Sequence, residues 1–240
     1  MPDSAAFGRD TEPFRRELFA HCYRMLGSIA DTEDLVQETY LRAWRSYDSF
    51  EGRSSVRTWL YQIATNACLT ALSRRDRRML PSGLYNAEPD PAVWPEAAGP
   101  DVAWLDPVPD TLAIPETADP AVIVTATALE RLLVEDVILE ATPLRSWYSG
   151  RRTCIPFLRD RLLGAAGDWR MLATGANGQP AAAVYTRDAD GQLQSYGVCV
   201  LTVTDRGISQ VTSLGNPGLL AVFGFPPQPG MTGPWTPSLR

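Results

Sequence analysis

A stretch crowded with proline divides this sequence into two parts. Residues 81–120 contain nine prolines and eight acidic residues, and residues 79–129 contain no arginine or lysine. Proline interrupts helices and central strands, and such a composition offers too little apolar surface to fold alone. We therefore expect residues 81–126 to form an acidic linker between two modest domains. Its apolar anchors, which could dock elsewhere, are Trp94, Trp104 and Leu105.

Residues 1–80, before the linker, repeat apolar side chains at helical spacing, which predicts an all-α bundle. The expected helices are Phe14–Leu26, a segment from Asp31 to about Ser46, and Val56–Ala71. Gly27 and Ser28 should end the first helix. We expect Asp31 to cap the second helix, and Ser54 or Ser55 to cap the third.

The sequence after the linker is typical of a sheet. ALERLLVED predicts a short helix, VILEAT a strand and RRTCIPFLRDRLL a basic amphipathic stretch. Turn signals at Asn177-Gly178, Asp190-Gly191 and 205–207 then separate four strand-like runs. Successive hairpins predict a curved antiparallel sheet with a covering helix over residues 127–225, so the whole chain is expected to be α+β. The following run NPGLLAVFGFPPQPG and the tail 226–240 are expected to be irregular.

The net charge of −6 hides a basic block. Residues 42–78 hold eight arginines against three acidic residues, a local balance of +5 that leaves −11 for the rest of the chain. A basic block in an acidic protein indicates one anionic partner met at one place, with a solvated helix face as the alternative.

The composition argues against a metal ion, a cofactor or a membrane as a partner. The four cysteines are far apart, without a C-x-x-C pair, and His21 is the one histidine, so we expect no metal site and no cofactor. The apolar runs are far shorter than the ~20 residues of a membrane helix, and the N-terminus does not resemble a leader. We expect no membrane association and a cytoplasmic location.

The stretch DTEDLVQETYLRAWRSYDSFEGRSSVRTWLYQIATNACLTALSRRDRR strongly resembles the core domain of extracytoplasmic-function (ECF) sigma factors. The resemblance covers roughly residues 12–80. It implies that DTEDLVQETYLRAW binds the RNA polymerase core, on the coiled coil of the largest subunit. It also implies that the next segment recognises and melts the minus-ten region of promoter DNA.

Two sets of candidate residues follow. On the core-binding helix, carboxylates suit an arginine-rich partner and leucines off the buried face offer apolar contacts, although ordinary helix-start charge placement is the alternative. This set is Asp31, Glu33, Asp34, Leu35, Glu38 and Leu41. Melted DNA needs polar edges and aromatic faces for the bases and arginines for the phosphates. This second set is Phe50, Arg53, Ser54, Ser55, Arg57, Tyr61, Thr65, Asn66, Arg74, Arg75, Arg77 and Arg78.

Residues 130–225 resemble the SnoaL-like, NTF2-like domain that is fused to one class of these sigma factors. The resemblance lies in ERLLVEDVILEATP, WYSGRR, the hairpins and NPGLL. Some relatives of that fold are enzymes, and the groups available for catalysis here are Asp136, Glu140, Asp168, Tyr148 and Tyr185. We expect a regulatory domain without catalytic residues.

One domain of such sigma factors is missing from this sequence. ADPAVIVTA resembles the start of the helix-turn-helix domain that reads the minus-thirty-five element, yet TALERLLVED follows at once and resembles the C-terminal domain past the start of its first helix. We infer a deletion near Ala126 or Thr127, which leaves that first helix incomplete. Three functions stay open: a sigma factor or truncated derivative, a non-initiating competitor for polymerase core, and an NTF2-like ligand-binding or isomerase-type module. An anti-sigma partner cannot be identified from the sequence.

Overall fold

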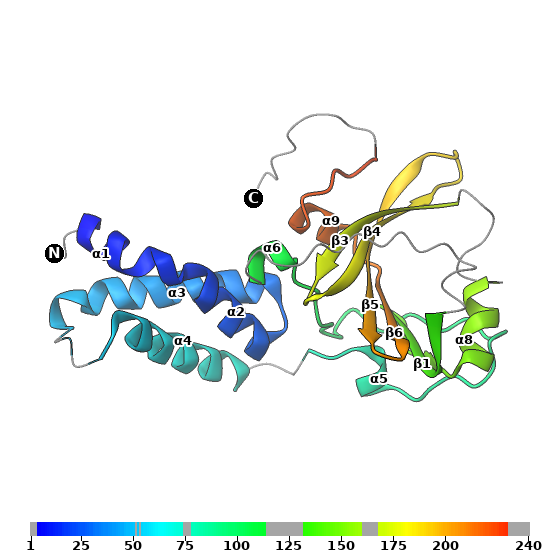
Figure 1. The fold of residues 1–240 in the computed structure, drawn as a ribbon, viewed down its shortest axis with the longest axis horizontal. Coiled ribbons are helices and arrows are strands. Elements are labelled where there is room, and N and C mark those ends of the chain that lie inside the picture. The colour runs from blue at the N-terminus through cyan, green and yellow to red at the C-terminus, as the bar shows by residue number, and fades with distance from the viewer. Residues whose placement is uncertain are drawn as a thin grey trace. The chain divides into compact units, whose positions relative to one another are not determined.

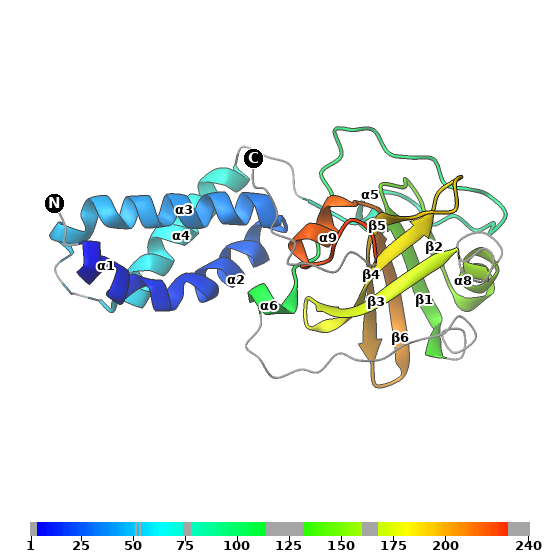
Figure 2. The ribbon, with the colours of Figure 1, turned by 90° about the horizontal axis from the view of Figure 1, so that it is seen from above.

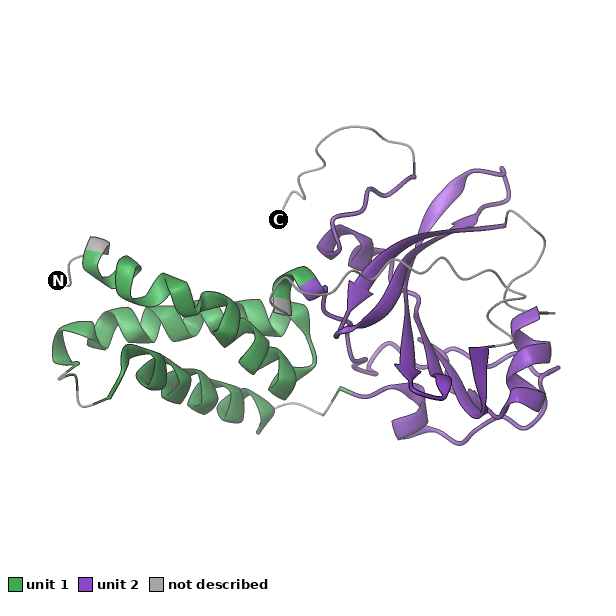
Figure 3. Ribbon diagram, in the orientation of Figure 1, with its two compact units in different colours: residues 1–78, 111–115 green, residues 79–110, 116–240 purple. Residues whose placement is uncertain are grey.

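The computed structural model describes residues 4–50, 52, 54–73, 78–113, 132–159 and 168–229. The chain forms two compact units, coloured separately in Figure 3. The first unit contains Met1–Arg78 and Thr111–Pro115, and the second contains Met79–Asp110 and Glu116–Arg240.

The first unit is a bundle of helices (Figures 1 and 2). Its elements are α1 (Ser4–Thr11), the 3-10 turn Glu12–Phe14, α2 (Arg15–Leu26), α3 (Ile29–Ser46), the 3-10 turn Tyr47–Ser49 and α4 (Val56–Leu72). Side chains at helical spacing fill its core, with Leu18, Leu60 and Ala64 fully buried. The three predicted helices are therefore confirmed.

The ends of these helices follow from local side chains. Gly27 ends α2 in the left-handed conformation that glycine adopts without strain (φ 64°). Ser28 caps α3, because its Oγ accepts a hydrogen bond from the Asp31 amide at 3.3 Å. The prediction that Asp31 is the cap was wrong, since Asp31 lies in the first helical turn. Of the two predicted alternatives, Ser54 and Ser55, it is Ser55 that caps α4, accepting from the Thr58 amide at 3.1 Å.

The second unit is a six-stranded curved sheet with strand order β2-β1-β6-β5-β4-β3. The strands are β1 (Leu133–Thr142), β2 (Trp147–Ser149), β3 (Trp169–Ala176), β4 (Gln179–Arg187), β5 (Leu193–Thr204) and β6 (Gly207–Leu214). The predicted Asn177-Gly178 turn is confirmed, and both residues have positive φ (56° and 72°), as a two-residue hairpin requires. The unit also contains the helices α8 (Arg151–Phe157) and α9 (Gly218–Val222). Helix α8 packs against β1 and β2, and it lies beside β1 in Figure 1.

Three details of this unit differ from the sequence-based expectation. The sheet is mixed, because β1 pairs with β6 in parallel while the other paired strands are antiparallel. Residues 133–136 belong to strand β1 and not to a helix, since Leu133 already pairs with Ile208 of β6. The run NPGLLAVFGFPPQPG is not wholly irregular, because burial of Leu219 and Leu220 stabilises helix α9.

The proline-rich segment Met79–Asp110 lies along the second unit and contains two short helices, α5 (Pro81–Leu84) and the start of α6 (Asp110–Ala113). Its backbone bonds to the edge strand β2, where the Glu88 amide donates to the Trp147 carbonyl at 2.7 Å. Further along, the Val108 amide donates to the Asn177 side chain at 3.1 Å. Over these residues the segment is part of the folded unit.

None of the helices within the described ranges is long and apolar enough to span a membrane.

Candidate polymerase and nucleic-acid interface

The outward face of α3 carries four of the six predicted core-binding residues. Helix positions such as Val36 and Ala43 point into the core. The opposite side therefore carries Glu33, Asp34, Glu38 and Leu41, all of which are exposed. The exposed fraction of Leu41 is 56%, which is high for a large apolar side chain. We call these four residues the α3 face.

The other two predicted residues, Asp31 and Leu35, are engaged inside the bundle. The Asp31 carboxylate pairs with the Arg78 guanidinium at 3.2 Å, and both side chains are largely buried. Leu35 packs against the hydrophobic core, so its predicted place off the buried face was wrong. Within the α3 face, Glu38 pairs with Arg42 at 2.8 Å one helical turn away, on the exposed surface.

The loop before α4 brings an aromatic pair together. Phe50 stacks on Trp59 of α4, with ring centroids 4.7 Å apart, and both side chains are half-buried. Ser54 is exposed, whereas the Ser55 hydroxyl is occupied as the α4 cap. Arg53 lies outside the described residues. Of this loop's predicted DNA-binding groups, Ser54 is therefore fully accessible and Phe50 only partly so.

A row of polar contacts joins α2 to α4, and we call it the α2–α4 ladder. Glu17 of α2 accepts hydrogen bonds from Arg57 Nε at 2.8 Å and from the Tyr61 hydroxyl at 3.3 Å. The Arg57 guanidinium lies over the Tyr61 ring, 4.9 Å from its centroid. His21 contacts the same ring, with centroids 4.9 Å apart, and bonds to the Thr65 hydroxyl at 2.9 Å.

The environment of the α2–α4 ladder shifts the pKa values of Arg57, Tyr61 and His21. The hydrogen bond and the negative charge of Glu17 raise the pKa of Arg57 further above its usual value. Burial, followed by the Glu17 charge, raises the pKa of Tyr61. Burial, followed by the positive charge of Arg24, lowers the pKa of His21, so its neutral form is favoured.

The remaining predicted DNA-binding residues are only partly described. Asn66 is exposed on α4, and Arg78 pairs with Asp31 as stated above. The arginines of the basic cluster at Arg74, Arg75 and Arg77 lie outside the described residues. Sequence reasoning missed Glu17 and His21, although their spacing of four residues matches that of Arg57 and Tyr61 and could have indicated two facing helix stripes.

The second unit does not gather its five candidate catalytic groups into one site. Glu140 is buried and accepts hydrogen bonds from the Ser82 amide at 3.0 Å and from the Gln210 side chain. The Tyr148 and Tyr185 hydroxyls donate to the Val93 and Pro226 carbonyls at 2.6 and 2.8 Å. Asp136 is exposed and Asp168 is half-buried.

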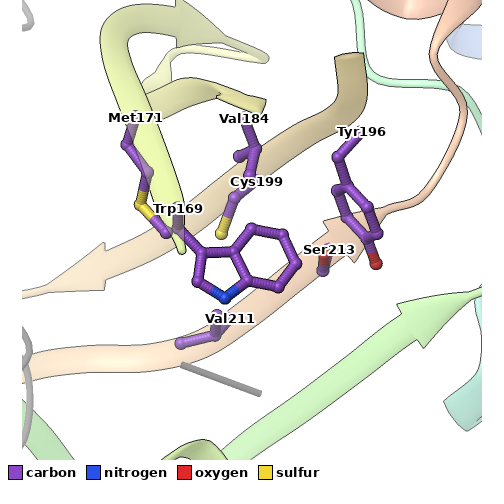
Figure 4. Close-up of a pocket in the computed structure, with 7 residues that line it drawn as sticks. All are labelled: Trp169, Met171, Val184, Tyr196, Cys199, Val211 and Ser213. Carbon is purple, nitrogen blue, oxygen red and sulfur yellow. The ribbon is translucent and has the colours of Figure 1, made fainter. Parts of the chain in front are cut away.

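A small hollow lies on the face of the sheet that carries β1 residue Leu139 and β6 residue Val211, and Figure 4 shows its side chains. Trp169, Met171 and Tyr196 contribute to a mostly apolar lining. None of the five candidate catalytic groups lines it. Among the described residues, no group of three His, Cys, Asp or Glu side chains could hold a metal ion.

Comparisons with known proteins agree with these two units. Residues 11–78 match the family Sigma-70 region 2. The ECF RNA polymerase sigma factor SigG of Mycobacterium tuberculosis is 33% identical over 314 aligned positions, which cover 92% of this chain and 84% of SigG. The crystal structure of the Mycobacterium tuberculosis extracytoplasmic function sigma factor SigJ is similar with a TM-score of 0.51 at 17% identity, covering 90% of this chain and 98% of SigJ.

An NTF2-like protein of unknown function from Mesorhizobium loti is similar over 36% of this chain and 74% of its own, at 22% identity and a TM-score of 0.29. This chain belongs to the family of ECF RNA polymerase sigma factors. The predicted α+β fold, with a helical sigma unit followed by a curved sheet, is confirmed.

The alignment with SigG is longer than this chain. Its 314 positions exceed the 240 residues present here, so SigG contains sequence without a counterpart in this chain. The junction expected near Ala126 or Thr127 lies outside the described residues.

Proposed function

We propose that this sigma factor binds the RNA polymerase core through the α3 face, on the coiled coil of the largest subunit. The observation that carries this proposal is the exposure of three carboxylates and Leu41 on one helix inside the matched residues 11–78. Exposed carboxylates attract an arginine-rich surface, and an exposed leucine gains free energy when a partner covers it.

The loop before α4 and the exposed side of α4 are the proposed site for the melted minus-ten strand. Exposed Ser54 and Asn66 offer polar edges to unstacked bases, and Arg57 offers a charge to the phosphates. Phe50 and Trp59 support the loop from inside, because they stack on each other. Tyr61 acts through Arg57, whose guanidinium it contacts.

Charge reversal on the α3 face tests core binding. Replacing Asp34→Lys together with Glu38→Lys should abolish co-purification of the full chain with polymerase core, because like charges would then face the arginine-rich partner. The matched control is Glu12→Lys, an exposed carboxylate of the same unit outside α3. Circular dichroism should show unchanged helix content in both variants. Undiminished co-purification of the double variant would contradict the proposed face.

A second candidate function is that of a competitor that occupies the core without initiating transcription. It is favoured by the alignment with SigG, in which SigG has sequence that this chain lacks. Loss of the domain that reads the minus-thirty-five element would leave core binding intact and remove part of promoter recognition. We propose a modulating role for the NTF2-like unit, since three of its five candidate catalytic groups are hydrogen-bonded within the fold.

A further inference from the structure

Glu17 holds the arginine that is proposed to meet DNA. Its Oε2 atom accepts from both Arg57 Nε and the Tyr61 hydroxyl, at 2.8 and 3.3 Å. Arg57 is thereby drawn across the Tyr61 ring, and His21 contacts the same ring. One carboxylate of α2 therefore fixes both the direction and the charge environment of Arg57.

The contact between Glu17 and Arg57 lies on the surface. The side chains of Arg57 and Glu17 are 55% and 47% exposed, so water and salt screen their attraction. A guanidinium binds a phosphate through the same charge-assisted hydrogen bonds that it makes with a carboxylate. A phosphate arriving at this surface can therefore replace Glu17 without leaving a buried charge unpaired.

We propose that Glu17 is a positioning residue that occupies the place of a DNA phosphate: it holds Arg57 in the free protein and is displaced by a phosphate of the melted minus-ten strand. The inference rests on the proposed DNA contact of Arg57. Helix α2 contains no predicted DNA-binding residue, yet through Glu17 it sets how strongly α4 attracts nucleic acid.

The exchange has a measurable electrostatic consequence. In the wild-type protein, the DNA strand must compete with Glu17 for Arg57. When the strand binds, the Glu17 carboxylate loses its partner and takes up a cation from solution. In Glu17→Gln, Arg57 is available from the start and no cation is taken up. The strand should therefore bind Glu17→Gln more tightly than the wild-type protein. Its affinity for the variant should also fall more steeply with salt, and the slope of log K against log salt should differ by up to ~0.7 for one phosphate of a single strand.

The experiment uses polymerase core bound to the full chain and a fluorescent forked minus-ten template, with affinity measured by anisotropy over a series of sodium chloride concentrations. Glu17→Gln should tighten binding about three- to tenfold at low salt, with the steeper slope. Glu17→Asp keeps the carboxylate and should restore the wild-type slope. The matched control Glu12→Gln removes one exposed carboxylate of the same unit and should change the slope little.

Arg57→Gln separates this inference from the proposed function. Arg57→Gln alone should weaken binding, and Glu17→Gln should give no gain when combined with it. If Arg57→Gln weakens binding but Glu17→Gln leaves affinity and slope unchanged, the role of Glu17 is refuted while the DNA contact stands. If Arg57→Gln has no effect, the proposed DNA contact fails, and the role of Glu17 fails with it. A gain from Glu17→Gln that persists without Arg57 would also overturn the inference.

Discussion

At the scale of single residues, short polar side chains at helix starts decide where the helices of the bundle begin. Ser55 has an extended backbone (φ −66°, ψ 150°) and its Oγ accepts from the Thr58 amide, one of the amides that a helix start leaves without a backbone partner. Its neighbour Ser54 is exposed, and no amide of α4 donates to it among the described contacts. The two serines therefore form a natural pair for comparison.

Ser55→Ala should lower the free energy of unfolding of the helical unit by about 1 kcal/mol, because the helix loses its cap. Ser54→Ala should change it by less than about 0.5 kcal/mol, as is usual for a surface substitution. Urea unfolding followed by circular dichroism measures both. Equal effects of the two substitutions would show that the cap contributes nothing.

Residue types indicated some of these positions and not others. The sequence offered Ser54 and Ser55 as alternative caps of α4, because serine is favoured at helix starts, and the backbone shows that Ser55 is the cap. Ser28 and Asp31 are both residue types that are favoured at a helix cap, and only the backbone shows that the helix starts at Ile29. Glu17 could not be found from α2 alone, since its significance comes from Arg57, which lies forty residues further along the chain.

At the scale of secondary-structure elements, the proline-rich segment shows what composition can and cannot predict. Its composition predicted a linker without enough apolar surface to fold alone, yet the segment is ordered by bonds to strands that follow it in sequence. Its Ser82 amide, in the first turn of α5, donates to the buried carboxylate of Glu140 on β1. The Tyr148 hydroxyl of β2 donates to the Val93 carbonyl of the same segment.

Glu140→Ala should destabilise the second unit by about 1–3 kcal/mol, because the Ser82 amide and the Gln210 side chain lose the buried carboxylate to which they donate. Glu135→Ala, on the exposed side of the same strand, is the matched control and should cost much less. Thermal unfolding gives the stability, and amide hydrogen exchange at Ser82 should accelerate in Glu140→Ala alone. Unchanged exchange at Ser82 would show that Glu140 does not hold the segment.

Hairpins could be predicted from the sequence, because a two-residue turn such as Asn177-Gly178 fixes both the pairing and the direction of its strands. The parallel pair of β1 and β6 could not, since nothing local to Leu139 specifies Val211 as its partner. Helix α9 was missed because its glycine- and proline-rich flanks hide two leucines that are buried only in the folded unit.

At the scale of the whole molecule, promoter recognition by such a factor has two energetic parts. Contacts to upstream duplex and contacts to melted bases are tethered, and two tethered modules bind far more tightly than either alone. The DNA contacts proposed for this chain, in the loop before α4 and on α4, are to melted DNA, and the chain is inferred to lack the helix-turn-helix domain for the upstream element. Its preference should therefore lie with DNA that is already open, because unstacking bases costs a few kcal/mol.

The most direct measurement is the affinity of polymerase core with this chain for matched promoter templates, one a closed duplex and one forked at the minus-ten region, each with a native or a scrambled minus-thirty-five sequence. We predict much tighter binding to the forked template and no response to scrambling. A strong loss of binding on scrambling the upstream element would contradict this, because it would require a recognition helix that this chain is inferred to lack.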